Sequence, residues 1–329
     1  MVGSHGHRGA SMAACASIPA SEYPPRFQCC TLARSGHRAR PGGGHVQAIV
    51  YACSVVLLFS GFVLVSRAGL STVLTLPDIA ALRFGIGGLL LLPIVLKHGF
   101  GGLRPAQALA LSTLGGLGFA LFAYAGFALA PAAHGAVLLH GTLSLTTAIL
   151  LWAVTNRLPQ GRQIIGLVVI GLGIVAMAWD GFGQASWRLL LGDACLLAAS
   201  LCWSGYGLYV RELDLPATRA AAIVAVVSAL AFLPVYAVLP GKMLFRASPQ
   251  DLLVQGLFQG VLIGAVSIFV YTRAVSLLGA ARVALFTAAV PGLTAIAGYV
   301  FLGEAPSLFV ALGVTLVTSG LLFSLRRAP

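Results

Sequence analysis

The residues that could do chemistry in this chain are a few polar side chains placed inside long apolar stretches. His140 lies about nine residues into the apolar run 131–153. A charge at the centre of a membrane-spanning helix costs roughly 2.5–3.5 kcal/mol, so a polar side chain kept there is a candidate for function. An unperturbed imidazole titrates near pH ~6.5, so His140 could hydrogen-bond a solute or carry a proton. The structural alternative is a neutral histidine bonded to a neighbouring helix.

Four further ionisable residues have electrostatic or structural explanations. Arg83 lies about one turn inside its apolar run, so we expect it to snorkel to the outer interface, with attraction of anionic substrates as the alternative. His134 and Asp193 each lie within about one turn of the start of a run, where solvation at the interface would explain them. Glu304 falls in a short connection and is expected to cap the last apolar run.

A set of aromatic residues lies deeper in the apolar runs. Aromatic rings with a polar tip suit a site that holds part-apolar organic solutes, and the alternative is an aromatic belt at the membrane interface. Pro291 breaks its run and frees backbone carbonyls, which is tolerated where they face protein or a water-filled cavity. The aromatic candidates for a substrate path are Trp203, Tyr206, Tyr124 and Tyr271.

No group of residues has the spacing of a catalytic or metal centre. The acids are few and dispersed, and the six cysteines lack zinc-ligand spacing. No Walker-type phosphate loop occurs. We therefore predict no catalytic residue, no metal and no cofactor, and keep a membrane-embedded transferase as an alternative function.

Composition indicates an integral membrane protein. Hydrophobic residues make up 59% of the 329 residues and charged residues only 9%, with a mean hydropathy of +0.96. A soluble domain needs roughly a quarter of its residues charged. The net charge of +12 does not indicate a nucleic-acid partner, because the basic residues sit in the N-terminal tail and at helix ends rather than on one face.

Apolar runs of about 17–25 residues recur from Val46 onward, the length that spans a bilayer. Residues 1–44 are rich in Ser, Gly, Pro, Arg and His and are expected to be a disordered tail. A count of nine runs is the alternative, since only a tight turn at Pro131 divides the third from the fourth. The ten expected spans are 46–66, 78–96, 106–126, 131–153, 162–179, 189–209, 217–239, 251–272, 280–301 and 306–325.

The distribution of basic residues predicts the orientation. With the N-terminus inside, 15 Lys and Arg residues fall on the cytoplasmic side and 5 on the other, or 10 against 5 without the tail. The excess marks the cytoplasmic side, so both termini are expected there, in a cell (inner or plasma) membrane. Ten spans can enclose a path within one chain, so an oligomer is not required.

The sequence contains an internal repeat. Phe59-Ser60-Gly61 is followed by Arg67, and Trp203-Ser204-Gly205 is followed by Arg211, at an offset of 144. Later helices match at an offset of 147, as in Tyr124 with Tyr271. We therefore predict two repeats, 45–181 and 188–326, and include Ser60 and Ser204 in the substrate path. Because each half has five spans, the halves enter the membrane from opposite sides, as in many secondary transporters.

These residues resemble the drug/metabolite transporter superfamily, specifically its EamA-type ten-helix permeases. The resemblance covers roughly residues 46–325 and rests on AALRF from Ala80, CWSGYGLYV from Cys202 and AVPGLTAIAGYVFLGEAPS from Ala289. It implies an all-α integral membrane protein, with ten transmembrane helices as two inverted five-helix repeats around a cavity. It also implies efflux or exchange of a small organic metabolite.

The first half departs from the family pattern. Asn156 and Arg157 stand where the family has Gly-Glu, and Ser144 stands opposite Pro291. The first span contains no acid, which disfavours carboxylate-coupled antiport and leaves His140 as the candidate for proton coupling. The predicted function is secondary transport by alternating access, as an exporter or exchanger. A non-transport scaffold is the other alternative.

Overall fold

Every regular element in the described part of the chain is a helix. The structure, a computed structural model, describes residues 44–156, 159, 161–183 and 186–325. The helices of the first half are α2 (Gly44–Leu70), α3 (Leu76–His98), α4 (Pro105–Ser112), α5 (Gly118–Leu129), α6 (Ala132–Gly135), α7 (Leu143–Thr155) and α8 (Arg162–Gly183). Those of the second half are α9 (Trp187–Glu212), α10 (Ala217–Val238), α11 (Pro249–Gln255), α12 (Ser267–Leu278), α13 (Ala280–Thr287), α14 (Val290–Leu302) and α15 (Leu308–Leu325), after the short 3-10 turn Leu244–Arg246.

These helices form ten crossings of the bundle. Among the described residues, nine helices are long and apolar enough to span a membrane, and Leu308–Ser324 is a shorter apolar helix. The third and fourth crossings are separate, with Pro131 capping the start of α6. Except for Gly44, which begins α2, the predicted tail lies outside the described residues.

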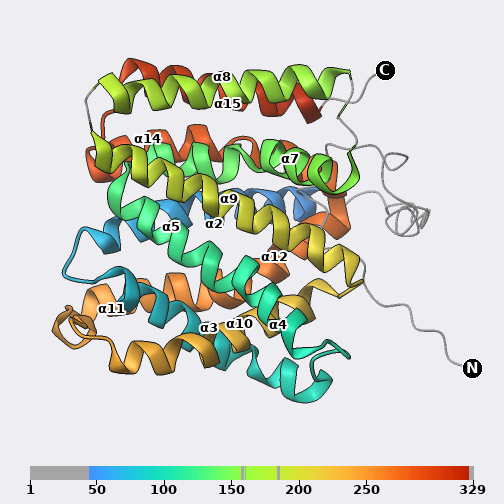
Figure 1. Cartoon of the computed structure of the whole chain (residues 1–329), viewed down its shortest axis with the longest axis vertical. Helices are drawn as coiled ribbons and strands as arrows, with labels where there is room; N and C mark the ends of the chain where they lie inside the picture. The colour runs from blue at the N-terminus through green and yellow to red at the C-terminus, as the bar shows by residue number, and fades with distance from the viewer. Residues whose placement is uncertain (1–43, 157–158, 160, 184–185, 326–329) are drawn as a thin grey trace, which may run out of the picture.

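The start of α2 and the end of α15 lie at the same end of the bundle, on the right of Figure 1. We call this the tail end; it also holds the connections 99–104 and 213–216. The opposite or far end holds the connections 71–75, 130–131, 239–248 and 303–307. Helix α2 therefore runs away from the tail end, whereas α9, which opens the second half, runs toward it. The two halves are inverted, as the odd number of spans predicts.

Contacts between the halves recur with the halves exchanged, as an in-plane pseudo-twofold axis requires. Equivalent helices pack together in the pairs α3 with α10 and α8 with α15. The contact of α5 with α9 is matched by that of α12 with α2, and the contact of α7 with α9 by that of α14 with α2. The repeat in the sequence is thus also a repeat in packing.

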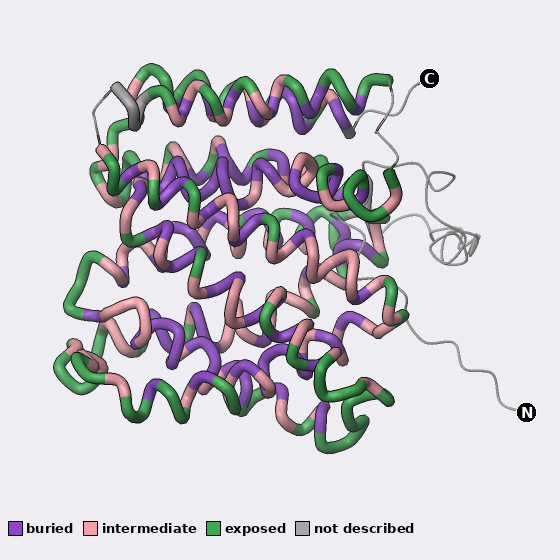
Figure 2. The backbone as a smooth tube through the Cα atoms, viewed as in Figure 1, coloured by how far each residue is buried: buried purple, intermediate pink, exposed green. Residues whose placement is uncertain are grey.

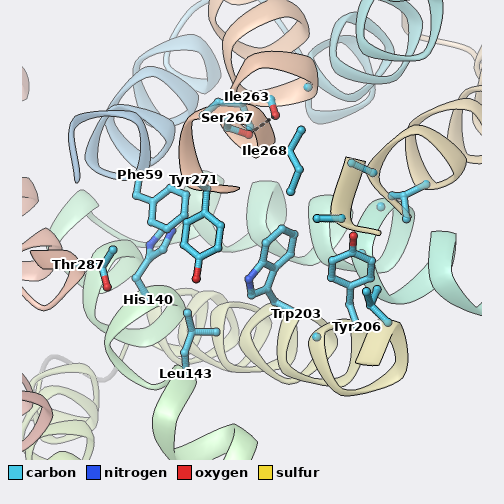
Figure 3. A pocket seen from close by; sticks show the side chains of 18 of the residues that line it. Phe59, His140, Leu143, Trp203, Tyr206, Ile263, Ser267, Ile268, Tyr271 and Thr287 are labelled. Carbon is cyan, nitrogen blue, oxygen red and sulfur yellow. Dashed lines mark hydrogen bonds between the residues drawn. The ribbon is translucent and has the colours of Figure 1, made fainter. Parts of the chain in front are cut away.

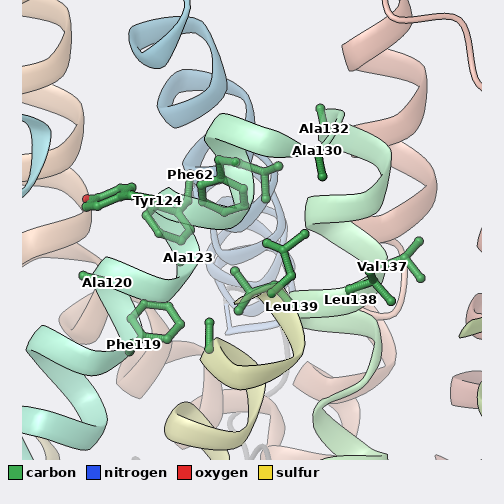
Figure 4. Packing of buried hydrophobic residues seen from close by; sticks show 14 of the residues in the cluster. Phe62, Phe119, Ala120, Ala123, Tyr124, Ala130, Ala132, Val137, Leu138 and Leu139 are labelled. Atoms are coloured by element: carbon green, nitrogen blue, oxygen red, sulfur yellow. The ribbon is translucent and has the colours of Figure 1, made fainter. Parts of the chain in front are cut away.

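The outer surface of the bundle is apolar. Figure 2 shows exposed residues along the outward faces of the helices. Large hydrophobic residues are among the exposed ones, for example Leu89 (71% exposed), Leu230 (68%) and Val238 (81%). Soluble monomers rarely expose continuous apolar surface of this kind, and in a bilayer it contacts lipid tails. The largest buried cluster lies between the halves and includes Phe62, Phe119 and Leu139 (Figure 4).

The fourth and ninth crossings are both interrupted near their middle. The ninth breaks at Ala288–Ala289, and α14 restarts with Pro291 in its first turn. The fourth holds a π-helical segment, Ala136–Gly141, and breaks at Thr142, which lies one repeat offset of 147 before Ala289. The first half therefore makes without a proline the break that Pro291 makes in the second.

The Asn156 departure is structurally conservative. Gly303 ends α14 in the left-handed conformation, with φ 68°. Asn156 ends α7 in the same way, with φ 54°. Asn is one of the few residues other than Gly that tolerates this backbone region. Arg157 lies outside the described residues.

Helices α8 and α15 approach closely through glycines. A Cβ added to Gly166 would lie 2.7 Å from the Gly320 carbonyl oxygen, and one added to Gly320 would lie 2.7 Å from the Gly166 oxygen. Small residues allow this approach where lipid gives no hydrophobic drive for association.

We expect Gly166→Ala and Gly320→Ala each to lower stability by about 1–3 kcal/mol, because the added methyl group meets backbone that cannot rotate away. The measurement is the Tm of the purified protein in detergent. Gly171→Ala is the matched control on α8, since its Cβ would meet nothing within 4 Å. Equal Tm values for all three variants would contradict this account of the packing.

Candidate functional site

A cavity of about 180 Å³ lies between the two halves. Its walls come from α2, α3, the third and fourth crossings, and from α9, α10, α12, α13 and α15. Tyr206 and Val210 from the end of α9, and Ala217 and Ala221 from the start of α10, place it toward the tail end. A solute in this cavity would contact both halves at once.

The cavity wall is largely aromatic. His140 stacks on Phe59, with 5.3 Å between ring centroids, and Phe59 stacks on Tyr271 at 6.3 Å. Trp203 and Tyr206 lie 5.3 Å apart on successive turns of α9. Figure 3 shows these rings, from four different spans, facing one space. Such a wall can hold the apolar part of an organic solute while its polar atoms orient it.

Arg83 also lines the cavity, so the expectation that it snorkels to the outer interface is wrong. Only 9% of the residue is exposed, and its guanidinium carbon lies 5.2 Å from the Phe62 ring centroid and 5.5 Å from that of Phe119. Its Nη1 makes no hydrogen bond to any described residue. Helix α3 turns this side chain into the bundle, which depth along the helix could not reveal.

His140 sits in the π-helical segment of the fourth crossing. Its Nδ1 is buried and has no hydrogen-bond partner among the described residues. The structural alternative for this residue was a bond to a neighbouring helix, and at Nδ1 none is present in the described part. An imidazole on a cavity wall can exchange a hydrogen bond with a solute.

The other predicted path residues lie outside the cavity wall. Tyr124 is fully buried, and its hydroxyl donates to Gln259 Oε1 at 3.1 Å. Ser204 is buried among the hydroxyls of Thr146 and Thr147. Ser60 is 3% exposed, and Pro291 is buried in the first turn of α14. The structure therefore gathers His140, Trp203, Tyr206 and Tyr271, with Arg83, around one space, and places these four elsewhere.

An ion pair joins the halves at the far end. Arg67 Nε donates to Glu304 Oε1 at 2.8 Å, and its Nη1 donates to the Phe127 carbonyl at 2.9 Å. Glu304 Oε2 accepts the Ala132 amide at 2.6 Å. Glu304 therefore caps the fourth crossing, and the expectation that it caps the last helix is wrong. Ser307 Oγ does that, accepting the Val310 amide.

A second pair lies deeper at the same end. His134 Nδ1 donates to Asp193 Oδ1 at 2.7 Å, and the two residues are only 1% and 6% exposed. Solvation at the interface, our expectation for both residues, is therefore wrong. Each lies near its helix start, as the sequence showed, but the partner helix covers it instead of water.

Asp78, which sequence reasoning missed, completes the far-end contacts. It is fully buried, accepts the Thr75 amide at 2.8 Å and the Tyr236 hydroxyl at 2.6 Å, and faces the Met243 amide. The signal was present, because Thr75 followed three residues later by an acid is a capping box. Two glutamines add bonds across the halves, Gln255 to the Val65 carbonyl and Gln259 to Ser66.

The far end is thus sealed by hydrogen-bonded pairs, and the cavity lies toward the tail end. Inverted repeats around a shared cavity are typical of a class of multi-span membrane transport proteins. Comparison of the sequence with known families identifies the family within this class. The EamA-like transporter family matches residues 46–179 and 190–326, one stretch in each half, and the chain belongs to this family of small-molecule transporters.

Structural comparison agrees with the fold. The chain is similar to a solved structure described only as "Crystal structure of protein", with a TM-score of 0.53 and 21% identity over 85% of this chain and 97% of that one. At this identity the likeness shows the fold alone. A search of curated proteins gave no match.

We expect Glu304→Ala to lower the free energy of unfolding by about 1–3 kcal/mol, because it leaves the Arg67 guanidinium and the Ala132 amide without this partner. The measurement is the Tm in detergent at constant pH. Glu212→Ala, at the exposed end of α9, is the control and should change Tm little. A Glu304→Ala protein as stable as the control would show that the pair does not hold the far end closed.

Proposed function

We propose that this protein is a secondary transporter of a small organic metabolite, an exporter or exchanger that works by alternating access. The observation that carries the proposal is the cavity itself. It lies between inverted halves, and the ion pairs that join the two halves in the described part of the chain, Arg67 with Glu304 and His134 with Asp193, lie at the end away from it. Exchanging the conformations of two similar halves would open the same cavity to the other side.

The orientation in the membrane is proposed from the basic residues. The tail end carries Lys97 at the end of α3, Arg104 in the connection 99–104 and Arg219 at the start of α10, as the orientation rule requires of a cytoplasmic face. In the proposed topology both termini are cytoplasmic in a cell (inner or plasma) membrane, and the structure corresponds to an inward-facing state. We propose that one chain contains the whole path, since helices from both halves of this chain line the cavity.

The transport proposal predicts that filling the cavity stops transport. Ile268 lines the cavity, and Ile268→Trp places a larger ring in the space a solute would occupy. We expect uptake into proteoliposomes to fall at least about tenfold, since a blocked site loses the binding on which turnover depends.

The matched control makes the same exchange on a lipid-facing surface. Ile149 is 46% exposed on α7, so Ile149→Trp should leave uptake within about twofold. Both variants are compared at equal protein incorporation, with solutes chosen by thermal-shift screening. Uptake that survives Ile268→Trp would contradict transport through this cavity.

Proton coupling, where present, is proposed to pass through His140. The other ionisable groups on the described cavity wall are Arg83, Tyr206 and Tyr271. Because an imidazole can take up and release a proton whereas the Arg83 guanidinium stays charged, His140→Ala should flatten the pH dependence of uptake. Uptake by His140→Ala with an unchanged pH profile would rule out this coupling, while leaving uncoupled exchange intact.

A further inference from the structure

We propose that the cavity selects organic anions, with a carboxylate bound by Arg83 and an apolar or aromatic body held against the neighbouring rings. This deepens the transport function proposed above and rests on it. The juxtaposition that carries the inference is a buried arginine without a counter-charge on the wall of a largely aromatic cavity.

The charge of Arg83 is not balanced within the described part of the protein. The described cavity wall contains no Asp or Glu. The ion pairs found there join Arg67 with Glu304 and His134 with Asp193, and Arg83 takes part in neither. Asp78, one and a half turns earlier on α3, is already bonded to Thr75 and Tyr236.

The contacts that Arg83 does make are neutral. Its guanidinium lies over the Phe62 and Phe119 rings and beside the Tyr124 hydroxyl. Cation–π contacts recover only part of the hydration that a buried guanidinium loses. Nη1 still has no hydrogen-bond partner among the described residues. A ligand carboxylate would supply both the missing acceptor and the missing charge.

The geometry around Arg83 indicates the shape of the solute. A guanidinium presents a planar fork of donors that matches the two oxygens of a carboxylate. Two rows of rings start at this point. Phe119 leads to Trp203, with centroids 4.8 Å apart, and Phe62 leads to His140 at 6.5 Å. A carboxylate at Arg83 therefore leaves the rest of the solute against aromatic rings.

The same wall disfavours other head groups. An amine, or the ammonium of an amino acid, finds no carboxylate on the described cavity wall to replace its hydration. A neutral amide leaves the charge of Arg83 unbalanced. Preference for an acid over its amide and amine of equal size is thus the direct consequence of Arg83.

The test uses three probes with one body and different heads: 3-phenylpropionate, 3-phenylpropionamide and 3-phenylpropylamine. Binding to the purified full chain is measured by concentration-dependent thermal shift and titration. We expect the acid to bind at least about tenfold more tightly than the other two, the order expected for hydrogen bonds to a charged group. Uptake into proteoliposomes should follow the same order.

Variants then assign the preference to one side chain. Arg83→Gln should reduce acid affinity at least about tenfold, to the level of the amide, and Arg83→Lys should keep part of the preference because it keeps the charge. The matched control is Arg162→Gln. Arg162 lies 4.7 Å from the Phe323 ring but is exposed and outside the cavity, so this change should leave all three affinities unaltered. Size-exclusion elution and Tm verify that each variant is folded.

Equal binding of the three probes, tighter binding of the amine, or no binding of the acid would overturn anion selection. An acid preference that survives in folded Arg83→Gln would also overturn it. Because the probe comparison uses the unaltered protein, a variant that fails to fold does not protect the proposal. Failure of the proposed transport function would give a different result. The acid would bind, Ile268→Trp would abolish that binding, and no probe would be taken up into proteoliposomes. This result would support the anion site and contradict transport.

Discussion

Hydrocarbon offers no hydrogen bonds, and this constraint limits where the ionisable side chains of the bundle can lie. Such a side chain needs a partner inside the protein or a water-accessible space, since a charge in lipid is costly. The far-end groups take the first solution: Asp78, His134 and Asp193 are buried and hydrogen-bonded to neighbouring elements. Arg83 and His140 take the second and face the cavity.

The pseudo-twofold axis relates backbones more faithfully than it relates side chains. Ser204 in α9 bonds to Thr147 in α7, whereas the equivalent Ser60 and Thr294 are both buried with hydroxyls that have no partner among the described residues. Among the described residues, hydroxyl hydrogen bonds thus join α7 to α9, and none joins the counterpart helices α14 and α2. In the proposed alternating-access cycle, the two conformations related by exchanging the halves would therefore differ in energy.

The sequence predicts what depends on composition and length along one helix. Ten spans follow from hydropathy because the bilayer fixes their length, and the repeat with the odd span count predicts the inversion. The break near Pro291 is also predictable, because proline cannot continue the hydrogen-bond ladder. The matching break at Thr142 is not, since no residue there is incompatible with a helix.

The errors share one cause, which is that partners across space are invisible in a single sequence. Depth placed Arg83 near an interface, but the face of α3 that carries it points into the bundle. Glu304 lies before the last helix in sequence, yet the amide it caps belongs to Ala132 in the other half. The residue type alone identifies the aromatic candidates. Which of them reach the cavity depends on the face of the helix that carries them: Tyr271 lines the cavity, whereas its repeat partner Tyr124 is buried outside it.

The π-helical segments Thr113–Leu117, Ala136–Gly141 and Gly256–Val266 have a consequence for motion. All three supply cavity wall, including Gly115, His140 and Ile263. A π turn holds one residue more than an α turn, and such wide turns cluster at functional sites. If the wide turn migrates along its helix, each residue it passes swaps one carbonyl acceptor for the next and swings about the axis by roughly 100°, one residue's share of a 3.6-residue turn. Movement of a π turn along one helix would thus change which side chains face the cavity. This change does not require α8 and α15 to separate.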